Sequence, residues 1–151
     1  KWLMVLILVL FLAGLFLPFK TFHGVFFDPK GRLMAPVVHY GWETLSFQMH
    51  FGVSILILLV SLSSGMALRL LLIRLLMVVL AMIVVVTFFS DIGFMLGMPY
   101  SSKLNVACYL SYTGVCLAWL YGFLHFRKSY PVYKRLLEEQ KKQSSDLLDS
   151  F

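Results

Sequence analysis

Hydrophobic residues gather in four long segments that are separated by shorter polar stretches. The segments cover residues 2–18, 50–68, 70–90 and 104–126. An α-helix rises about 1.5 Å per residue, so about 20 apolar residues cross the roughly 30 Å hydrocarbon core of a bilayer. The pattern predicts an all-α membrane protein, in which a four-transmembrane-helix bundle (residues 1–126) precedes a basic tail (residues 127–151).

The first segment follows Lys1, an arrangement that is also typical of a secretory signal peptide. No cleavage motif of small residues follows it, so we expect a helix that is retained in the mature protein.

The outer loop, residues 19–49, contains a strong turn signal. Asp28-Pro29-Lys30-Gly31 favours a type I turn. Residues 21–27 and 32–40 on either side are rich in aromatic and β-branched side chains, which predicts a short β-hairpin on the membrane surface. Residues 42–50 could add an interfacial turn of helix.

Two shorter connections complete the predicted bundle. Arg69 and Arg74 mark a short basic turn between the second and third spans. Gly93, Gly97 and Pro99 favour a short surface connection over residues 90–103.

The fourth segment carries two patterned faces, which predict that its helix is the centre of the bundle. One face is a heptad seam made of Asn105, Tyr109, Tyr112, Cys116, Trp119, Phe123 and Phe126. The other face holds small residues, which let helix backbones approach closely in lipid. The predicted packing and partner interface consists of Asn105, Tyr109, Ser111, Tyr112, Gly114, Ala118, Trp119 and Gly122.

The tail is expected to begin a new helix. Ser129 is a suitable N-cap, Pro131 is tolerated in a first helical turn, and residues 132–143 read as an amphipathic helix. Such a helix could lie on the membrane or bind a cytoplasmic partner.

Composition and charge placement support these assignments and set an orientation. The chain is 60% hydrophobic and 13% charged, whereas a soluble domain carries about 25% charged residues. Four spans place nine Lys and Arg residues on one side (1, 69, 74, 127, 128, 134, 135, 141 and 142) and four on the other (20, 30, 32 and 103). The positive-inside rule puts both termini in the cytoplasm and suggests a plasma membrane or a bacterial inner membrane.

Basic residues beside apolar spans indicate anionic lipids and exclude a nucleic-acid partner, because no separate basic domain exists. The predicted lipid contacts are Arg69, Arg74, Arg127, Lys128, Lys134 and Arg135.

No residue set predicts a catalytic, cofactor or metal site. His50 and His125 fall at opposite membrane faces, which excludes a bis-histidine haem. A metal site of His23, His39 and Glu43 depends on the hairpin register, and polar loop histidines are the better interpretation. Asp91 lies near the end of the third span, where we expect it to reach outer water or Lys103.

Cys108 and Cys116 lie about 12 Å apart along a helix, too far for a disulfide.

In outline the layout resembles claudin-type four-helix proteins, with a long first outer loop, a short inner turn and a basic tail. Trp42 stands alone in the loop without the family's W-G-L-W-C-C signature, so the resemblance covers topology only.

The leading functional hypothesis is a non-enzymatic accessory subunit that packs against and positions other membrane proteins. A small transporter or channel component is the alternative, with a path lined by Ser54, Ser61, Ser64, Asn105 and Tyr112. A lipid-handling enzyme using His23, His39, Glu43 or Asp91 is third.

Overall fold

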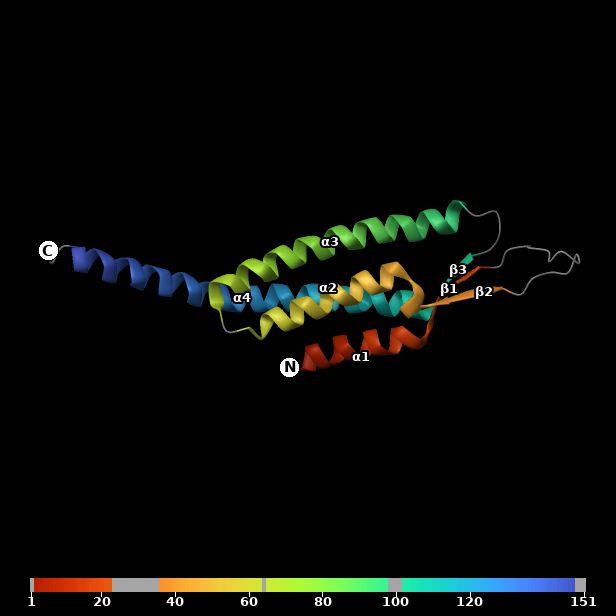
Figure 1. Cartoon of the computed structure of the whole chain (residues 1–151), viewed down its shortest axis with the longest axis horizontal. Helices are drawn as coiled ribbons and strands as arrows, with labels where there is room; N and C mark the ends of the chain where they lie inside the picture. The colour runs from red at the N-terminus through yellow and green to blue at the C-terminus, as the bar shows by residue number, and fades with distance from the viewer. Residues whose placement is uncertain (1, 23–35, 64, 98–101, 149–151) are drawn as a thin grey trace, which may run out of the picture.

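The computed structural model describes residues 2–22, 36–63, 65–97 and 102–148. These residues form four α-helices, three short strands and one 3-10 turn (Figure 1). The elements in chain order are α1 (Trp2–Phe16), β1 (Pro18–Phe22), β2 (Val37–Tyr40), η1 (Gly41–Glu43), α2 (Leu45–Ser61), α3 (Met66–Gly97), β3 (Ser102–Leu104) and α4 (Val106–Leu148). α3 and α4 are long and apolar enough to cross a membrane, whereas α1 and α2 are shorter apolar helices.

The four helices run side by side in an elongated bundle. The strands lie at one end, and the α2–α3 turn and both termini point to the other (Figure 1). α4 contacts α1, α2 and α3, which confirms the prediction that the fourth helix is the centre.

Small residues on α4 make this central position possible. A Cβ atom added at Gly114 would lie 2.9 Å from a ring carbon of Phe11, and one at Gly122 would lie 3.1 Å from the sulfur of Met77. Both glycines are buried. Larger side chains there would push α1 and α3 away from α4.

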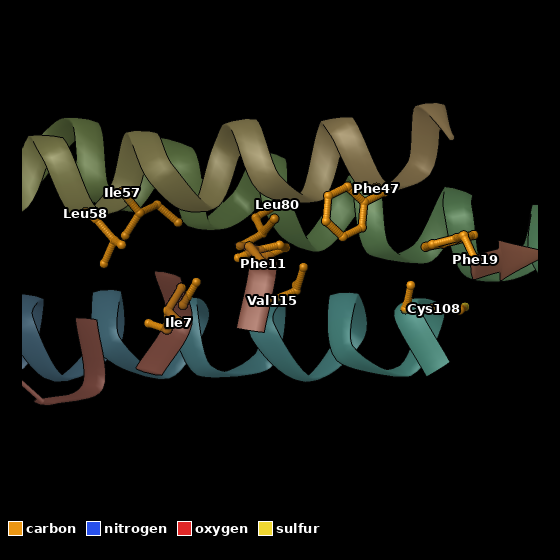
Figure 2. Packing of buried hydrophobic residues seen from close by; sticks show 11 residues of the cluster. Ile7, Phe11, Phe19, Phe47, Ile57, Leu58, Leu80, Cys108 and Val115 are labelled. Carbon is orange, nitrogen blue, oxygen red and sulfur yellow. The ribbon is translucent and has the colours of Figure 1, made fainter. Parts of the chain in front are cut away.

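The hydrophobic core fills the space between these helices, as Figure 2 shows for Phe11, Leu80 and Val115. Phe11 of α1 meets the rings of Phe47 and Phe51 on α2 edge to face, with centroids 5.9 and 5.6 Å away. Each such aromatic pair contributes about 1 kcal/mol of stability beyond that from the apolar area it buries.

The strands form a sheet in the order β2-β1-β3 with antiparallel neighbours. Thr21 lies opposite Val38 on one side and Lys103 on the other. The antiparallel pairing of β1 with β2 agrees with the predicted hairpin, although the predicted turn at 28–31 lies outside the described residues. β3 was not predicted, because three residues are too few to show an alternation of apolar and polar side chains. The strand forms only by pairing with β1, which is distant in the sequence.

The turn between α2 and α3 lies nearer the N-terminus than predicted. α2 ends at Ser61 and α3 begins at Met66, so Arg69 and Arg74 belong to α3 and not to the turn. Arginine is a good helix former, whereas residues 61–65 include three serines and Gly65. α3 also continues to Gly97, so the predicted surface connection from residue 90 is wrong over its first half.

The tail does not start a separate helix at Ser129. α4 continues through Pro131 to Leu148, and its second half projects beyond the bundle (Figure 1). Proline removes one hydrogen bond and frees the carbonyl of the residue four positions earlier, here Arg127. Residues 127, 128 and 130–132 are exposed, so water or lipid headgroups can satisfy that carbonyl.

Replacing Gly41 should destabilise the protein strongly. A Cβ atom at Gly41 would collide with the backbone carbonyl of Gly14, at the junction of η1 and α1. We expect Gly41→Ala to cost about 2 kcal/mol or more and to lower the melting temperature in detergent. The matched control is Gly52→Ala on an open face of α2, where no atom lies within 4 Å and helix propensity favours alanine. Equal melting temperatures for the two variants would contradict this close approach.

Candidate functional site

A network of polar side chains is buried in the bundle near the sheet. Its members come from β1, α2, α3 and α4 and are Lys20, His50, Thr87, Asp91, Ser111 and Tyr112. His50 and Ser111 each lie five residues after the start of their helix, about 8 Å inside the bundle.

Asp91 accepts hydrogen bonds from two directions. Lys20 Nζ forms an ion pair with Oδ1, and the Tyr112 hydroxyl donates to Oδ2 over 3.0 Å. The Asp91 side chain is 1% exposed. The expectation that Asp91 reaches outer water or Lys103 is therefore wrong, because the β1 strand brings Lys20 over the end of α3.

His50 links α3 to α4. Its Nε2 lies 2.9 Å from Thr87 Oγ1 and its Nδ1 lies 2.9 Å from Ser111 Oγ. Thr87 Oγ1 also lies 2.8 Å from the Ile83 carbonyl, which takes the single hydroxyl proton. Because the Thr87 proton goes to the Ile83 carbonyl, His50 Nε2 carries a proton and donates to Thr87. The ring is then neutral and accepts at Nδ1 from Ser111.

The sequence analysis placed His50 only at one membrane face and did not predict its buried partners. The sequence did carry a signal for the network: His50 and Ser54 are four residues apart on α2, as are Thr87 and Asp91 on α3. Polar residues at this spacing share one helix face. That face points into the bundle in both helices.

Each member of the network bonds at least one other member. Ser54 Oγ, one helical turn beyond His50, is buried and has no hydrogen-bond partner within the described part of the chain. Across the part of the chain that the structure describes, no three His, Cys, Asp or Glu side chains gather as metal ligands. His39 Nδ1 lies 3.9 Å from Glu43 Oε2, while His23 lies outside the described residues.

The predicted interface residues of α4 fall on two different faces. Ser111, Gly114, Ala118 and Gly122 are buried within the bundle, whereas Tyr109 and Trp119 are 64% and 43% exposed. Asn105 Nδ2 donates to Thr21 Oγ1 over 2.6 Å, and Tyr112 belongs to the buried network. A role for these residues in binding a partner stays a prediction.

The residues of the predicted transporter path are similarly divided. Ser54 and Ser61 are buried, and Ser61 Oγ bonds the Tyr121 hydroxyl at 2.9 Å. Ser64 lies outside the described residues.

An apolar groove opens between α3 and α4 on the outside of the bundle, and we call it the α3–α4 groove. Its volume is about 990 Å³. One wall is aromatic, and the other is aliphatic, with an arginine at one end. The lining residues are Arg74, Met77, Val78, Ala81, Met82, Val85, Val86, Trp119, Phe123, Phe126 and Tyr130.

The aromatic wall is ordered by stacking along α4. The rings of Trp119 and Phe123 are parallel with centroids 5.9 Å apart, and those of Phe126 and Tyr130 are 5.4 Å apart. The groove therefore offers a preformed apolar surface.

The predicted lipid-binding cations lie at the end opposite the sheet. Arg69 and Arg74 are on the first turns of α3, and Arg127, Lys128, Lys134 and Arg135 are on the projecting half of α4.

Comparison with protein families, curated proteins and solved structures finds no match to this chain.

The buried ion pair predicts a large effect of a conservative change. Asp91→Asn keeps the shape and the Tyr112 hydrogen bond but removes the charge beside the Lys20 ammonium. We expect a loss of roughly 3 kcal/mol, with partial recovery in Lys20→Met/Asp91→Asn. Chemical denaturation in detergent would measure both.

The control is Glu138→Gln, which removes the exposed pair between Lys134 and Glu138, 3.9 Å apart. That change should cost below about 0.5 kcal/mol. If Asp91→Asn were equally harmless, the Lys20–Asp91 pair would contribute nothing to the fold.

Proposed function

We propose that this chain spans a membrane four times and serves as a non-enzymatic accessory subunit that binds another membrane protein. The exposure of α3 supports the membrane location. Only 22% of its most apolar 18-residue window is buried. A core helix of a soluble protein would be largely covered, whereas lipid tolerates a helix with an apolar outer face.

The directions of the helices support four spans. α2, with 17 residues, meets the lower end of the roughly 17–25 residues that cross a bilayer. α1 has 15 residues from the first described position. The α2–α3 turn and both termini share one end of the bundle, as a four-span protein with cytoplasmic termini requires (Figure 1).

One observation carries the accessory role: an uncovered heptad seam on α4. Its residues follow steps of four and three along the helix and are Trp119, Phe123, Phe126, Tyr130, Tyr133 and Leu137. Trp119, Phe123, Tyr130 and Leu137 are 37–49% exposed. Heptad spacing is the pattern by which one helix packs along another.

The seam continues from the groove onto the projecting half of α4. A partner helix lying in the α3–α4 groove would meet the aromatic wall inside the membrane and Tyr133 and Leu137 beyond it. The projecting half extends beyond the other helices (Figure 1), and an isolated helix of this length is marginal in water. A partner that covers the seam would stabilise it.

A second candidate function is a small transporter component. The observation that favours it is the buried network, because ionisable side chains inside a membrane bundle often line an ion pathway. The unpartnered hydroxyl of Ser54 extends the line of polar groups beyond His50. Uptake by protein-loaded vesicles in response to a pH gradient, lost in Asp91→Asn, would favour this candidate over the first.

Labelling of single cysteines tests the four-span topology. With Cys108 and Cys116 replaced by alanine, a membrane-impermeant maleimide applied outside cells should modify Val37→Cys on β2. It should reach Lys134→Cys on α4 only after permeabilisation. Modification of both from the same side would exclude this topology.

Filling the groove should weaken partner binding without unfolding the protein. Ala81 lines the groove and Ala13 is exposed on α1, away from it. Ala81→Trp should reduce photo-crosslinking of a partner to a benzophenone side chain at Met82, whereas Ala13→Trp should not. Quantitative mass spectrometry of the adducts measures the change.

Two results would contradict the accessory role. Adducts formed only with lipid would mean that the groove faces the bilayer, and adducts only with this chain would mean self-association in place of a separate partner.

A further inference from the structure

A cluster of cationic side chains surrounds the α2–α3 turn, at the end of the bundle opposite the buried network. Arg69 lies on the first turn of α3, and Arg69 Nη1 donates to the carbonyl of Ser63 in the turn over 3.0 Å. His125 lies on α4 one helical turn beyond Tyr121, whose hydroxyl bonds Ser61 at the end of α2. Both side chains are therefore held against the same turn.

Two nitrogens of this cluster are buried and lack acceptors. Arg69 Nε and His125 Nε2 have no hydrogen-bond partner among the described residues. A buried polar nitrogen without a partner is costly, and a bound ion or ligand is one explanation for such an atom. The positive charges of Arg69 and Lys128 both act on His125, so the three side chains share one electrostatic environment.

Among the described residues, the nearest acidic side chains along α3 and α4 lie far from this cluster. No Asp or Glu occurs between Glu43 and Asp91 or between Asp91 and Glu138. Asp91 lies 22 residues along α3 from Arg69, a rise of about 33 Å. Glu138 lies 13 residues along α4 from His125, a rise of about 20 Å. These acidic residues therefore supply no counter-charge to the cluster, which leaves it available to an anion from outside the chain.

We propose that Arg69 and His125 bind the phosphate group of an anionic phospholipid at the α2–α3 turn, with Lys128 adding positive charge. The proposal rests on the proposed membrane-spanning topology, which puts this turn at the cytoplasmic headgroup layer. Guanidinium and imidazole donors suit phosphate oxygens, and basic pockets between transmembrane helices on that side bind anionic headgroups.

The phosphate site and the α3–α4 groove use different residues. The groove contains Arg74 and Tyr130, whereas the phosphate site uses Arg69 and His125 beside α2. The lipid and the partner helix would therefore occupy different surfaces of α3 and α4. A bound headgroup would join the α2–α3 turn to α4 from the side that the partner leaves free.

Native mass spectrometry of the full chain in micelles containing phosphatidylglycerol and phosphatidylcholine tests the proposal. We expect the protein to retain phosphatidylglycerol selectively. Arg69→Gln and His125→Gln should each weaken that retention about tenfold, the effect of losing one hydrogen bond to a charged group. Lys141→Gln on the projecting half of α4 is the matched control, because it removes an exposed cation outside the predicted lipid contacts, and it should retain the lipid like the parent protein.

Several results would overturn the proposal. Equal retention of both lipids, or unchanged retention in Arg69→Gln and His125→Gln, would mean that no phosphate site exists at the turn. Displacement of the lipid by excess inorganic phosphate would assign the site to free phosphate. A crosslink from this turn to an acidic segment of a protein, with no lipid retained, would assign it to a partner chain.

Folding and topology are separated from lipid binding by two further measurements. Phosphatidylglycerol should raise the melting temperature of the parent protein more than phosphatidylcholine does. This difference should vanish in His125→Gln. If only one of Arg69→Gln and His125→Gln folds, that variant alone tests the site. Ala81→Trp fills the groove but should keep full lipid retention. Lipid binding can therefore be confirmed even if no partner binds in the groove. Cysteine labelling reports the topology independently.

Discussion

The carboxylate of Asp91 is the interaction on which the sheet end of the molecule depends. It receives Lys20 from β1 and Tyr112 from α4 while sitting on α3, so one buried charge joins three elements. Burying a carboxylate costs several kcal/mol unless hydrogen bonds and an opposite charge offset it. The rest of the network continues from it, since Tyr112 also approaches Thr87 at 3.3 Å and Thr87 meets His50.

The helical part of the fold could be predicted from the sequence because long apolar segments are unambiguous. The small-residue face of α4 also indicated the centre of the bundle. Gly114 and Gly122 leave room for a close neighbouring helix, which a larger side chain would push away. Boundaries were less predictable. Arg69 and Arg74 were assigned to a turn because they are charged, yet arginine favours helix and its long side chain can carry the charge to the surface from within α3.

The polar network could not be predicted, since its pairs join residues as distant in sequence as Lys20 and Asp91. Taken alone, each member has an ordinary explanation. Lys20 lies in a predicted loop, Asp91 near the end of a predicted span, and His50 at the start of one. Only the pairing of β1 with both β2 and β3 places Lys20 above the end of α3. The heptad seam of α4, in contrast, was visible in the sequence as far as Phe126, but neither its continuation to Leu137 nor its exposure was.

The middle position of β1 has a consequence for the order in which the molecule assembles. β1 is made early in synthesis, yet one of its neighbours, β3, is made about 80 residues later, immediately before α4. Until that strand arrives, β1 carries an open edge of unpaired backbone groups, which are prone to pair with other chains. Such distant pairings form slowly because the loop between them must close first. Pairing of β3 with β1 is therefore the event that closes the sheet, and a chain that stops before β3 would expose an aggregation-prone edge.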